Sequence, residues 1–495
     1  MSWLPLLPLI IPLISAVISL LTWLQPVAWH RVISTLGSGA LLVAAVALLM
    51  VVWQDGIQSV QLADWRAPFG ITIVADLFSA IMVLTTAIIA FAVILFSPGT
   101  LDMRRESFEY YPLMQALVTG ICGTLLTGDL FNLYVWIEVT LIASFVLMAL
   151  GGELHQMEGA LKYVVLNLVS SALLLMTIGV IYGITGTLNM ADIAVKLETS
   201  SESGIALVLA MMLLVSFGIK AAAFPLFFWL PASYHTPPIA IIVIFAGLLT
   251  KIGVYALVRV FTLMFTFDTE ITHSLILVIA GLTMVTGVLG AVAQYDTRRL
   301  LSFHIISQIG YLLMGLGIFT KSALAAMIFF MVHVILAKSA LFMVSGYVNR
   351  IAGSYDLHRL GDLYRTRPGA AILFLIPALS LAGLPPFPGF FAKYALIRAG
   401  LERDQYFIIG TAIVVSVLTL YSMIKIWNEA FWKPAPEPIR AQEGPATLLV
   451  PTIAVIVIIV ALGIGAGPMF ELSNAAAEQL LDRTQYIEAT LGEMP

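Results

Sequence analysis

The sequence predicts an all-α polytopic membrane protein with 14 transmembrane helices. Three observations predict this class: the chain has 495 residues, 60% of them are hydrophobic, and only 11% are charged. A soluble domain is about 25% charged and about 45–50% apolar, so this chain has too little polar surface to cover a soluble particle. The composition excludes a soluble enzyme, a nucleic-acid-binding protein and a disordered protein.

The spans follow from the length rule that a transmembrane helix needs about 20 mostly apolar residues. The first segment has neither a basic region before it nor a cleavage signal after it, so we expect a retained span rather than a signal peptide. The tail from Phe470 to Pro495 is polar enough for a surface helix or a disordered end. The fourteen segments are 3–24, 31–53, 72–97, 110–127, 130–150, 160–186, 205–230, 237–262, 271–294, 299–320, 322–348, 370–398, 405–431 and 447–468.

Charge and cysteine content narrow the chemistry. The net charge of −4 implies no polyanion partner and therefore no nucleic acid. The single cysteine, Cys122, makes neither an intrachain disulfide nor a cysteine cluster. The histidines and carboxylates show no metal-ligand spacing, and no glycine-rich stretch continues into a phosphate-binding loop. The sequence therefore predicts no cofactor and no metal.

Basic residues in the loops predict the orientation in the membrane. If residues just inside a span end are counted with the adjoining loop, loops after odd-numbered spans hold 12 of them and loops after even-numbered spans, with the tail, hold 7. The odd loops should therefore be cytoplasmic, with both termini outside the cytoplasm. The first set is Arg31, Arg104, Arg105, Lys162, Arg298, Arg299, Arg350, Arg359, Arg365, Arg367, Lys433 and Arg440; the second is Arg66, Lys196, Arg259, Lys321, Arg398, Arg403 and Arg483.

The remaining five basic residues lie inside apolar spans. They are Lys220, Lys251, Lys338, Lys393 and Lys425. A charge at bilayer depth costs at least about 2.5–3.5 kcal/mol, so such residues face the interior of a helix bundle and mark ion or proton paths. Lysine suits a proton relay because its proton affinity changes readily with its surroundings.

A short motif occurs twice, as Phe-Pro-Leu-Phe-Phe at 224–228 and as Phe-Pro-Gly-Phe-Phe at 387–391. Lys220 precedes the proline of the first copy by five residues, and Lys393 follows that of the second by five. Proline breaks a helix, and broken helices in a membrane line buried or polar sites. Two breaks in corresponding halves indicate an internal repeat with a transport site near the midplane. The predicted break residues are Pro225, Pro385, Pro386 and Pro388.

Glu138 is the acidic residue at mid-span, and we expect it to act as a charge partner for a lysine. The alternative is a carboxyl group that burial keeps neutral. Tyr255 stands one helical turn after Lys251 and is a candidate hydrogen-bond partner for it. Lys425 precedes Glu429 by four residues near a span end, which favours a local ion pair.

The tenth and eleventh spans carry the histidines. His333 and Lys338 are five residues apart and so about 140° apart around a helix; either could be a structural hydrogen bonder or part of a relay. His304 opens a polar face with Ser307, Gln308 and Tyr311, consistent with a water-lined path. Asp76 and Asp129 stand at the starts of spans, where we expect helix caps. A proton-uptake role is the alternative for Asp129, and Asp76 is an accessory candidate for the relay together with His304 and Tyr255.

These motifs resemble the proton-pumping antiporter-like family, which includes membrane subunits of respiratory complex I, membrane hydrogenases and Mrp cation/proton antiporters. The resemblance covers the whole chain, most strongly about residues 70–435. It implies a fold with two inverted five-helix repeats, TM4–8 and TM9–13, with TM7 and TM12 broken. It places the family's fifth-helix glutamate at Glu138 and its relay bases on helices 7, 8, 11 and 12. Those bases are Lys220, Lys251, His333, Lys338 and Lys393.

Within the family the chain is most similar to D-type subunits of Mrp antiporters. It lacks the lateral-helix extension of the largest complex I subunit, and its twelfth-helix residue is Lys393 where the middle complex I pump subunit is expected to have glutamate. The resemblance implies exchange of cytoplasmic Na⁺ or K⁺ for external protons in a bacterial inner membrane, with partner subunits of types A, B, C, E, F and G. A redox-driven proton pump of complex I or hydrogenase type is the alternative. The expected divisions are 1–105 (TM1–3), 106–265 and 266–435 (the two repeats) and 436–495 (TM14 and the tail).

Overall fold

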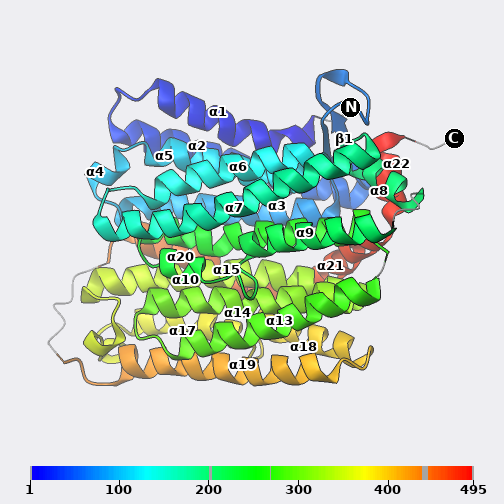
Figure 1. Cartoon of the computed structure of the whole chain (residues 1–495). Coiled ribbons are helices and arrows are strands. Elements are labelled where there is room, and N and C mark those ends of the chain that lie inside the picture. Colours follow the sequence, from blue (N-terminus) through cyan, green and yellow to red (C-terminus); the bar gives the residue numbers. More distant parts are fainter. Residues whose placement is uncertain (1–2, 200–202, 268, 437–443, 493–495) are drawn as a thin grey trace.

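The computed structural model describes residues 3–199, 203–267, 269–436 and 444–492 as one bundle of helices lying side by side (Figure 1). Both chain ends, β1, α8 and α22 lie at one end of the bundle, which we call the terminal face; α4 lies at the opposite face. Arg440, which belongs to the basic residues of the odd loops, lies outside the described residues.

Twelve helices in the described part of the chain are long and apolar enough to cross a membrane, so this is a multi-pass membrane protein. The two other expected spans are α5 (Tyr110–Leu126) and the pair α17 (Pro368–Ala382) and α18 (Pro388–Leu401), which are shorter. The total of 14 therefore stays a prediction. The twelve are η1–α1 (Leu4–Leu21), α2 (Val27–Asp55), α3–η3 (Leu77–Gly99), α6 (Leu130–Met148), α7 (Leu154–Thr185), α9 (Ser203–Ala221), α11–η4–α12–η5 (Ile239–Met264), α13 (Thr269–Val292), α14 (Thr297–Ile318), α15 (Lys321–Ala352), α19–η7 (Tyr406–Trp432) and α20 (Ala446–Ile464).

Short elements close both faces. A two-stranded antiparallel sheet pairs Gln58 with Ala75 and Gln61 with Thr72. The tail after the last span forms helices, as one of the two expectations had it. The elements are β1 (Gln58–Gln61), η2 (Leu62–Asp64), β2 (Thr72–Ala75), α4 (Met103–Glu106), α8 (Met190–Thr199), α10 (Trp229–Ser233), η6 (Leu357–Arg359), α16 (Leu363–Thr366), α21 (Ala466–Leu481) and α22 (Arg483–Leu491).

The backbone repeats itself in inverted orientation. Asp129 forms an isolated antiparallel bridge with Asn189, and Asp296 forms the same bridge with Asp356. The equivalent residues are 167 positions apart in both cases, and each aspartate caps the helix that follows it, α6 or α14. The chain enters α6 from the terminal face and α14 from the opposite face (Figure 1). The two bridges therefore fasten opposite ends of the bundle.

The long helix after each capped helix follows the same spacing. Both α7 and α15 have 32 residues. Each ends at a glycine in the left-handed conformation, Gly186 or Gly353, again 167 positions apart. Since glycine has no Cβ, it ends a helix in this conformation without strain. Matching lengths, caps and ends support the two five-helix repeats of the expected fold.

The two breaks are also equivalent, but at a different spacing. Ala222 and Gly383 have positive φ, 59° and 87°. The following N–H groups reach back five residues, from Ala223 to Gly218 and from Leu384 to Leu379, and so complete the same helix-ending motif. These positions differ by 161, whereas the Phe-Pro motif recurs at 163.

The Phe-Pro recurrence thus marks both breaks but is two residues out of structural register. Three of the predicted break residues lie in the breaks: Pro225 in the first, Pro385 and Pro386 in the second. The prediction for Pro388 was wrong in one respect, because it is the first residue of α18 and begins that helix. Proline is suited to this position because the first helical N–H has no partner within the helix.

Candidate functional site

Lys220 lies in the last turn of α9, just before the break. Its ammonium donates to Ser171 Oγ on α7 at 3.0 Å, and the residue is 8% exposed. It borders a cavity of about 30 Å³ whose wall includes Thr140, Asn167 and Tyr234. A cavity of this size with polar groups in its wall can hold a water molecule or two. The first break therefore places a lysine against polar partners in the interior of the bundle.

Glu138 lies on α6 and is half-buried. Its charge acts on Lys220, although no ion pair within 4.0 Å joins the two among the described residues. Within the same part of the chain, its Oε1 atom is buried and has no hydrogen-bond partner. The pair is thus close enough to interact electrostatically, and its separation leaves room for the attraction to change.

Lys251 is fully buried on α12, directly after the π-helical turn η4 (Phe245–Leu249). Its ammonium donates to the Ala246 carbonyl in that turn at 2.6 Å. The expected bond with Tyr255 was wrong: the Tyr255 hydroxyl donates to the Leu125 carbonyl and accepts from Arg259 instead. Single π turns within α-helices are frequent at functional sites.

The two repeats meet between Lys251 and Lys338. A Cβ at Gly247, one turn before Lys251, would lie 2.6 Å from Ser339 Oγ on α15. Lys338, next to Ser339, is fully buried and donates weakly to the Leu301 carbonyl at 3.4 Å. The charges of Lys251 and Lys393 both act on Lys338. Lys338 is therefore near enough to both lysines to interact with them electrostatically.

His333 and His304 are the two buried histidines near Lys338 and Lys393. His333 Nδ1 lies 3.4 Å from Ser380 Oγ, and His304 Nε2 lies 2.6 Å from Ser422 Oγ. The second nitrogen of each ring is buried without a partner in the described structure. Lys338 and Lys393 act electrostatically on both rings. Each ring thus has one bonded nitrogen and one that can take or give a proton.

The polar face predicted after His304 is present but only partly bonded. The Tyr311 hydroxyl donates to the Ala412 carbonyl at 2.6 Å. Ser307 Oγ and both side-chain polar atoms of Gln308 are buried and lack partners among the described residues. Buried polar groups that lack a protein partner are commonly hydrogen-bonded to water.

Lys393 is the last of the buried lysines in the sequence and lies at the second break. Its ammonium donates to the carbonyls of Leu381 and Ala382 at 3.0 and 3.2 Å and to Ser416 Oγ at 3.1 Å. The two carbonyls belong to the last turn of α17, whose negative helix end attracts a cation. The Tyr311 ring lies 4.9 Å from the ammonium. The break therefore forms a binding site for the charged lysine.

Sequence reasoning missed one buried ion pair. Asp76 caps α3, as expected, through a capping box with Ser79. Its Oδ2 also lies 2.6 Å from Arg259 Nη1, and both side chains are buried. Arg259 lies in α12, inside the expected span 237–262. Its spacing of four and eight residues from Tyr255 and Lys251 was the available signal.

Two further expectations concern residues near span ends. Asp129 caps α6 by accepting from the Asn132 N–H at 2.7 Å, as predicted. The predicted ion pair of Lys425 with Glu429 was wrong, because Glu429 pairs with Lys433 at 2.6 Å. Lys425 donates to the Val292 and Gln294 carbonyls, so it caps the end of α13.

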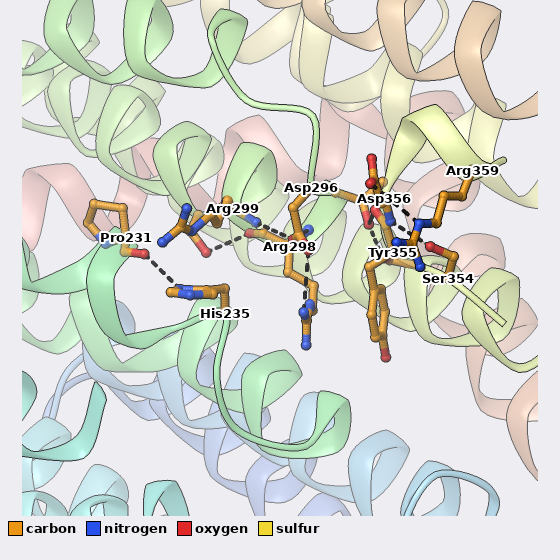
Figure 2. Close-up of polar contacts among 12 residues, drawn as sticks. Pro231, His235, Asp296, Arg298, Arg299, Ser354, Tyr355, Asp356 and Arg359 are labelled. Carbon is orange, nitrogen blue, oxygen red and sulfur yellow. Dashed lines mark hydrogen bonds and ion pairs between the residues drawn. The ribbon is translucent and has the colours of Figure 1, made fainter. Parts of the chain in front are cut away.

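A polar cavity of about 450 Å³, the vestibule, opens at the opposite face. His235 borders it and donates from Nδ1 to the Pro231 carbonyl, with Arg298 and Arg299 at the adjacent start of α14 (Figure 2). Burial and the nearby Arg299 charge lower the pKa of His235 from 6.5 to about 4. The preceding residue, Tyr234, borders the inner cavity of Lys220. Two consecutive residues thus border two different cavities, the vestibule and the cavity beside Lys220.

The start of α14 is held in place beside the vestibule. Arg298 bonds Asp296 and stacks over the Tyr355 ring at 4.1 Å, and the Asp296–Asp356 bridge joins the two loops (Figure 2). Over the described ranges, no group of three or more His, Cys, Asp or Glu residues is arranged to hold a metal.

Comparisons with known proteins agree on one family. A family model described as "NADH:quinone oxidoreductase/Mrp antiporter, TM" matches residues 127–419. The D-type subunit of the Na(+)/H(+) antiporter of Alkalihalophilus pseudofirmus is 46% identical, with all of both chains covered. A chain of the Mrp complex from Dietzia sp. superposes with a TM-score of 0.91 at 32% identity, covering 99% of this chain and 100% of that one. A chain of the membrane-bound sulfane sulfur reductase, an archaeal respiratory membrane complex, gives 0.90 at 25%, with the same coverage.

Proposed function

Since the chain belongs to the NADH:quinone oxidoreductase/Mrp antiporter family, we propose that it is the proton-translocating subunit of a multisubunit monovalent cation/proton antiporter. The complex exchanges cytoplasmic Na⁺ or K⁺ for external protons. The observation that carries this proposal is the line of buried bases through both repeats. Such residues are costly in a membrane and are found where protons or ions pass.

The relay is built from Glu138, Lys220, Lys251, Lys338 and Lys393. Glu138 stabilises the charged form of Lys220 without touching it, so a change in their separation changes how readily Lys220 gives up its proton. Ser171 holds the Lys220 ammonium. Protons pass from Lys251 to Lys338 across the contact between the repeats, and the free nitrogens of His333 and His304 take part between Lys338 and Lys393.

The vestibule connects the relay to the face on which it opens. Tyr234 and His235 line the inner cavity and the vestibule respectively, and they are consecutive residues just after α10. A neutral imidazole at His235 can accept a proton on one nitrogen while the other donates to Pro231. The excess of basic residues in the odd loops supports a cytoplasmic position for this face, with both termini outside the cytoplasm. The membrane we propose is a bacterial inner membrane.

The remaining parts have supporting roles. The divisions 106–265 and 266–435 contain the relay, 1–105 forms helices beside the first repeat, and 436–495 adds TM14 and the tail. Subunits of types A, B, C, E, F and G are the partners, and cation binding outside this chain changes the Glu138–Lys220 separation. The chain itself is a secondary transporter subunit and carries no enzyme activity.

The test uses Glu138→Ala and Lys220→Ala in the assembled complex, with Lys321→Ala as the matched control. Lys321 is an exposed lysine on α15. Loss of cation-driven proton movement in both relay variants, with normal assembly and a normal control, supports the proposal. Normal transport in either relay variant would contradict the proposed function.

The second candidate is a proton pump driven by redox chemistry in neighbouring subunits. The superposition on a chain of an archaeal respiratory membrane complex favours it. The same bases would serve, but proton movement would need an electron donor. The identity to a Na(+)/H(+) antiporter chain over the full length favours the first candidate.

A further inference from the structure

A polar stripe runs along α12 away from the relay. Lys251, Tyr255 and Arg259 are spaced by four residues and so share one face of the helix. Arg259 Nη2 donates to the Tyr255 hydroxyl at 3.0 Å, and the Phe78 ring stacks on Tyr255 at 4.9 Å. The stripe leads from the buried Lys251 to the terminal face.

The stripe ends at the Asp76–Arg259 ion pair. The two side chains are 3% and 7% exposed, and Asp76 Oδ1 accepts from the Ser79 N–H at 2.8 Å. Breaking a buried pair leaves two uncompensated charges, so the pair stays closed unless water reaches it. The relay is thereby shut off from the terminal face at this point.

The C-terminal helix α22 covers the pair. The Tyr486 ring lies 5.0 Å from the Arg259 guanidinium and is itself buried. A Cβ placed on Gly128, in the loop before α6, would lie 3.2 Å from the Tyr486 hydroxyl, so the ring fills the gap between that loop and the ion pair. A ring over a desolvated guanidinium is a favourable cation–π contact.

Few bonds hold α22 against the bundle. Ser59 Oγ donates to the Ala489 carbonyl at 2.5 Å, and Gln61 Nε2 donates to the Thr490 carbonyl at 3.2 Å. An exposed ion pair joins Arg483 to Glu198 at 3.1 Å. Bonds at the surface contribute little, so α22 is held mainly by its buried side chains Tyr486 and Ile487.

The corresponding end of the second repeat is arranged differently. Arg259 directly precedes the π turn η5 (Val260–Met264), and Lys425 precedes the corresponding π turn η7 (Asn428–Trp432) by three residues. Lys425 lies partly exposed at the opposite face, 3.6 Å from the Tyr295 ring. Lys425 thus caps the end of α13, whereas Arg259 forms an ion pair that lies under Tyr486.

We propose that α22 is a lid over a second proton port, in which Asp76, Arg259 and Tyr255 connect Lys251 to the terminal face. The lid closes the port by seating Tyr486 on Arg259. When α22 lifts, water reaches Asp76, and the terminal face exchanges protons with Lys251 along Tyr255. The inference rests on the proposed function, because the port is proposed to conduct protons.

The first test measures access to the port in the full complex. Phe78→Cys, in a Cys122→Ala background, places one thiol beside Tyr255, and a membrane-impermeant maleimide is added from the terminal face. With Tyr486→Ala we expect labelling about tenfold faster than with Tyr486→Phe, which keeps the ring. Equal labelling rates in the two backgrounds would overturn the lid.

The second test locks the lid. Ser59→Cys with Ala489→Cys, in the same background, is oxidised to link α22 to β1. Cation-driven proton exchange should fall at least about tenfold on linking and return on reduction, while each single-cysteine variant is unaffected by oxidant. Undiminished exchange in the linked protein contradicts the lid.

The remaining outcomes separate the two proposals. Failure of the pair to link, with both thiols free to react, contradicts the closed contact. If the reduced double variant and the wild type both lack cation-driven exchange, the proposed function fails, whatever the lid does.

Discussion

Gly389 offers a sharp test of how the second break positions Lys393 and His333. A Cβ at this position would lie 1.9 Å from the Ser380 carbonyl oxygen and 2.7 Å from His333 Nε2. Ordinary contacts need about 3.5 Å, so Gly389→Ala must separate the start of α18 from the end of α17 by about 1.5 Å. Overpacking of this kind costs about 1–3 kcal/mol.

The same displacement carries Lys393 away from the Leu381 and Ala382 carbonyls. Misplacing a reacting group by about 1 Å can cost about 100-fold in rate, so exchange should fall about 10- to 100-fold while the complex still assembles. The assay is cation-driven acidification or alkalinisation of everted vesicles, with subunit recovery measured in parallel. Gly410→Ala is the control, because nothing lies within 4 Å of a Cβ there. Wild-type exchange in Gly389→Ala would refute the reasoning.

Three further predictions concern other contacts. Asp76→Asn leaves Arg259 buried and unpaired, so it should lower the unfolding free energy by about 3–5 kcal/mol in thermal or denaturant melts; adding Arg259→Leu should recover part of that loss, and no recovery would argue against the pair. Ser171→Ala removes the acceptor of the Lys220 ammonium, a bond worth about 1.5–3 kcal/mol, so exchange should slow about tenfold or more, whereas Ser171→Thr should retain it. The pKa of His235 is lowered to about 4, so the unfolded chain binds a proton below pH 6.5 that the folded chain refuses; stability should therefore fall from about pH 6.5 to about pH 4, and His235→Gln should flatten that part of the melting profile, a result that an unchanged profile would contradict.

The sequence was sufficient to locate twelve membrane-spanning helices and to predict which lysines are buried within them. Hydropathy locates spans because the thickness of the lipid bilayer sets their minimum length. A lysine within an apolar run, such as Lys251 or Lys338, is expected in the interior of the bundle because its charge is costly in lipid. The recurrence of the Phe-Pro motif located both breaks, because proline removes a backbone donor from a helix interior.

The partners of these residues could not be predicted, because they lie on other helices. Lys251 donates to a carbonyl of a π turn rather than to Tyr255. The spacing of residues in the sequence does not predict a π turn, so this bond could not be expected. Glu429 has lysines four residues away on both sides, Lys425 and Lys433, and only the position of α13 decides between them. The Asp76–Arg259 pair joins residues 183 positions apart, which no helical periodicity connects.

The internal repeat shows the limit of sequence motifs most clearly. The Phe-Pro motif recurs at a spacing of 163, but the helix-ending hydrogen bonds at the breaks recur at 161. Backbone geometry is set by Ala222 and Gly383, and the phenylalanines merely pack around it. The structurally equivalent residues of the two repeats are therefore identified by their backbone hydrogen bonds rather than by the Phe-Pro motif.

The energy source of proton movement tests the central claim most directly. Everted vesicles containing the full complex, with this chain wild type or Lys220→Ala, are given a Na⁺ or K⁺ gradient without any electron donor. The account predicts proton movement in the wild type and its loss in Lys220→Ala. Proton movement that appears only after an electron donor is added would contradict antiport and establish a redox-driven pump that uses the same lysines.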